Sequence, residues 1–335
     1  MTEFTVSRRR FNTLLGTGIV GGLAMPSLAL GQSAREIRLA HHTALESEQQ
    51  LTAEVFARKV AEYSGGSLKV TILPAAQMGG QREIIESVSL GVLEMGYGEG
   101  GIYSSYVPQF GIIALPYLYK DFDHWQRVVD GPIGADLAQR LEQNGNITLL
   151  NWLTGGYRNT FLRTKAIEKP ADFAGIKIRL PEAPVFVRTF SHLGALPTPI
   201  PAPEMYSALQ TGVVDAMEGS LEVGYTYKIY EVTKFLSMTQ HILNDGSFAI
   251  NTGFFDGLAA EQQEALTKAA AEAAVDQRAN HFQRQQGWFD KLKSESPIAV
   301  NEPDLVPFQA ALVPVQDEFA AASQATDLLA QIRAT

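Results

Sequence analysis

Apolar and polar residues alternate along the first part of the chain with two periods, one typical of strands and one of helices. Residues 36–40 and 67–73 have the strand period, and between them apolar side chains return at the helical period. A second helix pattern at 82–90 leads to a buried strand at 93–98. This order predicts an α/β protein with a mostly parallel, doubly wound sheet, which binds ligands beyond the carboxyl ends of its strands.

The middle of the chain continues the same alternation of predicted strands and helices. The apolar run 112–118 predicts a strand, 122–144 a single long helix, and 146–152 a strand that returns to the sheet. Further strands and helices are expected, in order, at 175–180, 184–193, 196–200, 203–210, 213–217 and 221–230. A returning crossover is expected at 234–242, and a strand that rejoins the first part of the sheet at 247–251.

An alanine-rich helix is expected over 259–295, and it is much longer than a usual helix. Gly287 is its only glycine, it contains no proline, and its apolar positions do not hold the heptad of a coiled coil over enough turns. A further helical stretch is expected at 306–332.

The length of the chain predicts two domains, because 335 residues are more than a single hydrophobic core usually supports. The glycines at 155–156 suit a hinge between them. The predicted first domain comprises residues 35–155 and about 245–284, and the second comprises 156–244 and about 285–335.

The bulk composition narrows the classes of function. A net charge of −9 argues against nucleic acid as a partner, because nucleic acids favour basic patches. The absence of cysteine excludes disulfides, thiol nucleophiles and thiolate metal sites. The six histidines are scattered and neither HExxH nor GxSxG occurs, so we expect no metal site, no cofactor and no catalytic triad.

The amino end has the pattern of an export signal. Residues 7–11 (SRRRF) precede an apolar, glycine-rich run at 14–30, which is typical of a twin-arginine signal peptide. A basic-ended membrane anchor is the alternative, but the run is short and is interrupted by Pro26. We therefore expect residues 1–34 to be a cleaved signal and the mature protein to be periplasmic.

Arg179 is a permanent cation in a segment that otherwise has the pattern of a buried strand. Apolar side chains flank it at Ile176, Ile178 and Leu180, and Pro181 ends the run. A buried guanidinium must be paired, and its planar fork matches the two oxygens of a carboxylate. The partner is either an Asp or Glu of the protein, in a structural ion pair, or the carboxylate of a ligand.

A series of motifs surrounds Arg179 in a fixed order. They are GYR at 156–158, DFAGIKIRLP at 172–181, PTPI at 197–200, EMYSALQTGVVDA at 204–216 and TQHILND at 239–245. In these motifs and their spacing the chain resembles the extracytoplasmic solute-binding subunits of TRAP transporters, the DctP/SiaP type. The resemblance implies a two-domain periplasmic binding protein fold, with a cleft that closes on an organic acid and a long helix that spans both domains. It also implies delivery of the acid to TRAP membrane subunits, and we expect a monomer.

The resemblance assigns Arg179 as the arginine that binds the ligand carboxylate. Arg158, in the GYR motif, matches a second arginine of the same cleft, and a salt bridge across the hinge is the alternative. His42 and Glu99 each follow a predicted strand and match polar contact positions that suit ligand hydroxyls. The alternative is that His42 and Glu99 are ordinary loop residues.

The chain departs from the family pattern at two places. Glu218 falls where the family has a polar cleft residue, but Gly219 and Ser220 replace the Asn-Pro of sialic-acid-type members. Ala202 stands where those members have an aromatic residue. Both departures argue against sialic acid and indicate a ligand of a different shape.

Three tyrosines in the segment 225–230 are candidates for stacking on a ring of the ligand. The helical spacing of Tyr227 and Tyr230 is more typical of packing. Tyr225 is therefore the one of the three that we take as a candidate site residue.

The predicted function is capture of an organic acid, such as a dicarboxylate, a sugar acid or a related carboxylate, without catalysis. A periplasmic ligand sensor would use the same closure of the cleft, and the sequence does not separate the two. A hydrolase or lyase that uses His and Glu is a third interpretation, which no catalytic motif supports.

Overall fold

A computed structural model describes residues 34–335 of the chain. The predicted twin-arginine motif and the apolar run after it lie outside these residues. Among the helices that are described, none is both long enough and apolar enough to cross a membrane.

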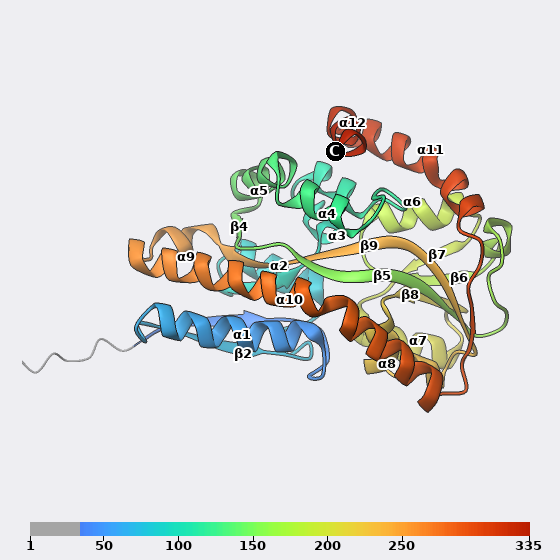
Figure 1. The fold of residues 1–335 in the computed structure, drawn as a ribbon, viewed down its shortest axis with the longest axis horizontal. Helices are drawn as coiled ribbons and strands as arrows, with labels where there is room; N and C mark the ends of the chain where they lie inside the picture. The colour runs from blue at the N-terminus through green and yellow to red at the C-terminus, as the bar shows by residue number, and fades with distance from the viewer. Residues whose placement is uncertain (1–33) are drawn as a thin grey trace, which may run out of the picture. The chain divides into compact units, whose positions relative to one another are not determined.

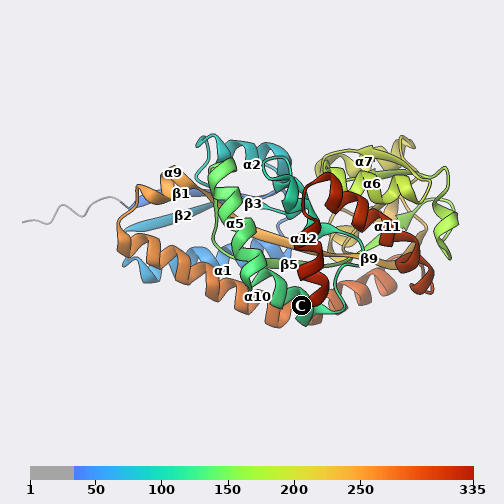
Figure 2. The same ribbon diagram turned by 90° about the horizontal axis from the view of Figure 1, so that it is seen from above.

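The described part of the chain is built on a sheet of ten strands (Figures 1 and 2). In chain order they are β1 (Arg35–Ala40), β2 (Leu68–Leu73), β3 (Met95–Gly98), β4 (Ile147–Leu149), β5 (Leu153–Leu162), β6 (Lys177–Leu180), β7 (Leu196–Pro199), β8 (Ala216–Gly219), β9 (Phe235–Asn251) and β10 (Ala299–Asn301). Most lie side by side in the order β2-β1-β3-β9-β5-β8-β6-β7, while β4 and β10 each pair with β9.

The two ends of this sheet are parallel and its centre is antiparallel. We name β2, β1 and β3 the first half-sheet and β8, β6 and β7 the second half-sheet, and neighbouring strands within each are parallel. Between them, β9 and β5 run antiparallel to each other and to the strands on either side. The prediction of a mostly parallel sheet is thus confirmed for the half-sheets and wrong for the centre.

Helices cover both half-sheets. On the first, α1 (Glu48–Tyr63) begins where the Ser47 hydroxyl accepts a hydrogen bond from the backbone N–H of Gln50, and Phe56 and Val60 are buried beneath the helix. The other helices here are α2 (Gln81–Ser89) and α3 (Gly100–Tyr103). On the second half-sheet lie α6 (Pro184–His192), α7 (Met205–Thr211) and α8 (Leu221–Thr226), with the short 3-10 helices η2 (Pro170–Phe173), η3 (Ala202–Glu204) and η4 (Ile229–Glu231).

The strand predicted at 112–118 is wrong. The chain forms a 3-10 helix there, η1 (Pro108–Ala114), and its residues 110–114 are almost wholly buried. A run of apolar residues indicates that a segment is buried, but its periodicity alone does not show whether the buried segment is a strand or a helix. Pro116, which has no N–H to give a sheet, follows it.

The helix predicted at 122–144 is two helices, α4 (Phe122–Val129) and α5 (Pro132–Gly145). Pro132 has no N–H to continue the first helix, and it suits the first turn of the second. The apolar period continues across the break because both helices bury their inner faces in the same core.

The predicted hinge glycines lie inside β5, not in a linker. Gly156 has a φ of +72°, and the pairing of β5 with β9 shifts register between Thr154 and Gly156, which marks a β-bulge. The predicted crossover at 234–242 and strand at 247–251 are together the single strand β9. The chain therefore passes between the half-sheets as continuous strands, and the predicted domain boundaries stay predictions.

The long helix predicted at 259–295 is confirmed as α10 (Ala260–Glu295). It packs against α1 beside the first half-sheet and against α8 beside the second (Figure 1). Its buried positions include Ala265, Ala269, Ala270, Ala273 and Ala274, whose small side chains allow close approach to α1. The expected terminal stretch is two helices, α11 (Val306–Ala322) and α12 (Thr326–Ala334).

Candidate functional site

A small cavity lies between the half-sheets and is lined by residues from the ends of their strands, from β5 and β6, and from the helices beside them. The space open to the centre of a water molecule within it is about 60 Å³. Its lining consists of His42, Gln81, Arg82, Glu99, Ile102, Arg158, Arg179, Pro181, Glu182, Pro201, Ala202, Met205, Val223 and Tyr227. Four of the six residues singled out from the sequence are therefore brought together.

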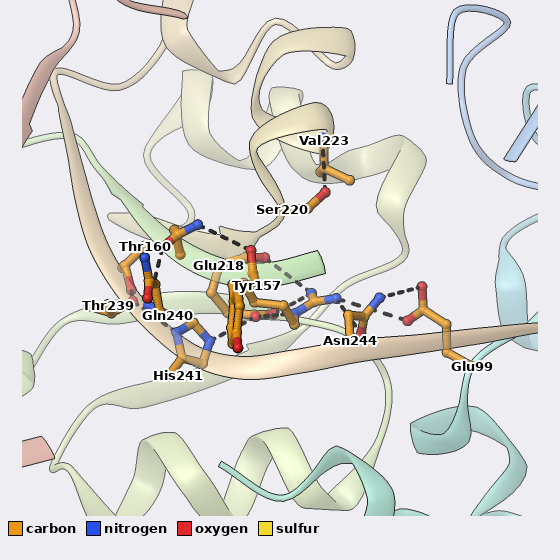
Figure 3. Close-up of polar contacts among 12 residues, drawn as sticks. Glu99, Tyr157, Thr160, Glu218, Ser220, Val223, Thr239, Gln240, His241 and Asn244 are labelled. Atoms are coloured by element: carbon orange, nitrogen blue, oxygen red, sulfur yellow. Dashed lines mark hydrogen bonds and ion pairs between the residues drawn. The ribbon is translucent and has the colours of Figure 1, made fainter. Parts of the chain in front are cut away.

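Arg158, on β5, is held by Glu218 on the neighbouring strand β8. The Nε atom of Arg158 donates to Glu218 Oε2 at 2.5 Å and Nη2 donates to Oε1 at 2.8 Å, so the pair is bidentate. His241 Nε2 lies 3.2 Å from the same Oε2 (Figure 3). Glu218 is fully buried and does not line the cavity, so in this structure its carboxylate contacts Arg158 and His241.

The charges of this pair stabilise each other. Burial by itself favours the neutral form of Glu218, but the charge of Arg158 and hydrogen bonds from His241 and Arg158 outweigh it and lower the pKa of Glu218 to about 2. Burial would lower the pKa of Arg158, and the charge and hydrogen bonds of Glu218 raise it instead. Burial lowers the pKa of His241, so its imidazole is neutral at pH 7.

Arg179, on β6, has no such partner. Its Nε donates to the carbonyl oxygen of Ile200 at 2.7 Å, and the side chain is 4% exposed. Among residues 34–335, no carboxylate oxygen lies within 4.0 Å of its guanidinium. Burial lowers the pKa of Arg179 to about 10, so it stays a cation at neutral pH whose Nη groups are left for another acceptor.

Glu99 follows β3 and faces the cavity from the first half-sheet. Asn244 Nδ2 donates to Glu99 Oε1 at 3.1 Å (Figure 3), and Arg158 Nη1 lies 4.0 Å from Glu99 Oε2. Burial raises the pKa of Glu99, and Arg158 and Asn244 only partly offset it. Glu99 is therefore a weakly paired carboxyl with acceptor capacity toward the cavity.

His42 and Tyr227 meet across the cavity. The hydroxyl of Tyr227 donates to the carbonyl oxygen of His42 at 2.7 Å, which joins α8 and its following turn to the loop after β1. Burial, with the charges of His41, Arg179 and Arg158, lowers the pKa of His42 to about 3. A neutral His42 has one ring nitrogen that accepts a hydrogen bond, and its buried Nδ1 has no partner within the described residues.

A second contact between the half-sheets closes one side of the cavity. Arg82 Nη2 donates to the carbonyl oxygen of Glu182 at 2.5 Å, and Arg82 Nε lies 3.6 Å from Glu182 Oε1. Both residues line the cavity. Neither was singled out from the sequence, although Glu182 directly follows the IRLP motif that contains Arg179.

Tyr225 lies outside the cavity. Its hydroxyl donates to Glu295, and its ring packs against Tyr230 and Trp288 of α10. The tyrosine that lines the cavity is Tyr227. Helical spacing predicted packing for Tyr227 and Tyr230 and left Tyr225 as the site candidate; the structure instead packs Tyr225 against Tyr230 and places Tyr227 in the cavity lining, so the choice between Tyr225 and Tyr227 was wrong. No group of three or more potential metal ligands occurs among residues 34–335.

A cavity held between two half-sheets, with an unpaired buried arginine, is the arrangement of a solute-binding protein. The profile of the bacterial extracellular solute-binding protein family 7, DctP, matches residues 39–323, and the chain belongs to this family of TRAP solute-binding proteins. The family consists of periplasmic binding proteins and is not a family of enzymes.

Individual relatives agree with this assignment. A solute-binding protein of Verminephrobacter eiseniae is 32% identical over 91% of this chain and 90% of its own. The 2,3-diketo-L-gulonate-binding periplasmic protein of Escherichia coli is 31% identical, over 88% and 89%. The crystal structure of a TRAP periplasmic solute-binding protein of Roseobacter denitrificans with bound β-D-glucuronate is 31% identical, with a TM-score of 0.86 over 90% of this chain and 100% of that one.

Proposed function

We propose that this protein captures a hydroxylated monocarboxylic acid of the sugar-acid class, whose carboxylate pairs with Arg179. The observation that carries the proposal is the state of Arg179, which is buried and has no carboxylate partner among the described residues. An uncompensated buried cation is costly, and a bidentate ligand carboxylate would compensate it.

The charges around the cavity favour a ligand with one carboxylate. Arg158 is neutralised by Glu218, and Arg82 faces Glu182. Among the cavity-lining residues of the described part of the chain, this leaves Arg179 as the unpaired cation and Glu99 as the weakly paired carboxyl. A second carboxylate on the ligand would add a negative charge beside Glu99. Hydroxyl groups suit that end of the cavity, because Glu99 and neutral His42 accept hydrogen bonds. The relatives named for 2,3-diketo-L-gulonate and β-D-glucuronate bind acids of this kind.

Capture involves closure of the predicted domains, 35–155 with about 245–284 and 156–244 with about 285–335, around the acid. The Tyr227–His42 and Arg82–Glu182 contacts hold the closed form. The closed protein delivers its ligand to TRAP membrane subunits as a monomer, without catalysis, after export through the twin-arginine signal.

A thermal-shift screen of the mature protein against sugar acids and four-carbon dicarboxylates tests this function, because binding to the folded form raises its melting temperature. Calorimetry then compares D-gluconate with the diacid D-glucarate and the neutral alcohol D-glucitol, which share one carbon skeleton. We expect D-gluconate to bind at least about tenfold more tightly than either. Stabilisation by neutral solutes and by no carboxylate would contradict the proposal.

The Tyr227→Phe substitution tests whether the closed form depends on the hydrogen bond to His42. Loss of one such bond costs about 1 kcal/mol, which corresponds to a Kd about fivefold higher. The matched control is Tyr225→Phe, which removes the hydroxyl that contacts Glu295 outside the cavity and is expected to leave the Kd unchanged. A larger effect from Tyr225→Phe in the calorimeter would reverse the assignment of the two tyrosines.

A further inference from the structure

A second polar cluster lies apart from the ligand cavity, where α1, α8 and α10 meet. Glu48, at the start of α1, accepts from Arg284 Nη1 at 2.9 Å and lies 2.7 Å from His281 Nδ1, both on α10. Glu222, on α8, accepts from the backbone N–H of Glu48 at 3.1 Å. Glu48, Glu222 and His281 are each at most 4% exposed. The cluster therefore joins elements of both half-sheets through buried ionisable groups.

The two carboxyls of this cluster differ in their partners. Glu48 has a cation and an imidazole within hydrogen-bond distance. Glu222 has a single hydrogen bond to its side chain within residues 34–335, from a neutral backbone amide, and no cation within 4.0 Å. A buried carboxyl that has no cation of its own, next to a second carboxyl that has one, favours its protonated form.

Charged or titratable groups surround Glu222 on several elements. Glu48 approaches it from α1, and Arg284 acts on it from α10; His281, also on α10, contacts Glu48. Tyr97, in β3, and Tyr227, after α8, lie close enough to Glu222 for its charge to raise the pKa of their hydroxyls. Burial raises the pKa of Glu222 to about 8; Glu48 adds to the rise, while the hydrogen bond from its backbone and the charge of Arg284 offset part of it.

We propose that Glu222 is a proton-binding site that is filled when α8 closes against α1, so that ligand capture takes up a proton. This inference rests on the proposed function, because it requires that the ligand stabilises the closed form. When α8 leaves α1, Glu222 meets water and ionises as an ordinary glutamate. Closure removes the carboxyl from water beside Glu48, and the proton replaces the missing cation.

The sign of the linkage follows from these two states. The closed-state pKa of about 8 lies above the ordinary value of 4.5, so protonation favours closure below pH 8 and the effect fades as pH rises through 8. The uptake of one proton allows the Kd to rise at most about tenfold per pH unit. We expect this slope between about pH 6 and 7, and a plateau above about pH 9.

Calorimetric titrations with D-glucuronate, D-gluconate and D-galactonate, each in two buffers that differ in heat of ionisation, measure the proton uptake from the difference in heat. The buffers are phosphate and Tris at pH 7, and carbonate and ethanolamine at pH 9.5. At pH 7 we expect close to one proton per ligand, and at pH 9.5 almost none. Glu222→Gln keeps the shape and the acceptor oxygen but cannot titrate, so the uptake and the pH dependence of the Kd should disappear. Glu46→Gln, at an exposed carboxyl two residues before Glu48, should retain both.

The outcomes separate this inference from the function on which it rests. If a ligand binds with measurable heat but without proton uptake, or if proton uptake persists in Glu222→Gln, the proton site is refuted and the proposed function stands. Absence of heat with all three acids would contradict the proposed function and the inference together. If Glu222→Gln does not fold, Glu48→Gln serves in its place: removing the neighbouring charge should move the midpoint of the uptake to lower pH, and an unmoved midpoint would refute the site.

Discussion

Replacing Arg179 by lysine is expected to raise the Kd for the acid by about 30-fold to several thousand-fold, which corresponds to a loss of 2–5 kcal/mol of binding energy. The charge is retained, but an ammonium group does not reproduce two parallel hydrogen bonds to a carboxylate. Arg179 also donates through Nε to Ile200, which fixes the plane of the guanidinium toward the cavity, and lysine has no such second anchor. Isothermal titration of the mature protein measures the change.

The control for this substitution is Arg140→Lys, on the surface of α5, where the arginine forms an exposed ion pair with Asp136. It should bind the acid as the unchanged protein does. Near-normal affinity in Arg179→Lys would mean that the ligand carboxylate lies elsewhere. Arg158 would then be the alternative, and its pairing with Glu218 would have to open on binding.

The second large effect is expected for Glu218→Gln, which should lower the free energy of unfolding by about 3–5 kcal/mol. The substitution leaves Arg158 buried without its counter-charge, although the shape of the side chain is nearly kept. Ligand affinity should fall as well, because Glu218 fixes the guanidinium that lines the cavity. Urea denaturation at pH 7 measures the stability.

The pH dependence distinguishes a lost charge from a packing defect. The pKa of Glu218 is about 2 in the folded protein and 4.5 in its ordinary state, so its contribution is present above about pH 4.5 and is lost as pH falls toward 2. The difference in stability between the two proteins should therefore shrink in acid. Glu142→Gln, exposed on α5, is the control and should match the unchanged protein throughout. A difference that stays constant down to pH 2.5 would point to packing.

The sequence was sufficient for those parts of the fold in which local pattern and tertiary role agree. The strands and helices of both half-sheets, and the exceptional length of α10, follow from periods of two and 3.6 residues with clear ends at glycine or proline. The centre of the sheet was missed because β5 and β9 are buried on both faces and carry no alternation. The glycines at 155–156 indicated a hinge, whereas the strand absorbs them as a bulge.

The candidate site divides in the same way. Arg179 and Arg158 were found because each stands in a motif that matches the family pattern, and His42 and Glu99 because each follows a predicted strand and matches a polar contact position of the family. The pairing of Arg158 with Glu218 depends on which two strands are neighbours, and only the sheet order supplies that. Arg82 lies on the surface of α2 and Tyr227 directly follows α8. The helical spacing of a side chain that faces a cavity is the same as that of a side chain that faces a neighbouring element, so the sequence does not separate the two.

The continuity of α10 has a mechanical consequence. A helix of 36 residues is about 54 Å long, and this one is anchored to α1 at one part and to α8 at another. If the half-sheets rotate relative to each other, α10 must bend elastically along its length, because its backbone is a continuous helix without a loop at which the chain could turn. Its restoring force then opposes one of the two states at all times. If the bent state is the one that binds the ligand, the ligand must supply that elastic energy as well as the cost of desolvation, and its release returns the energy to the reverse motion.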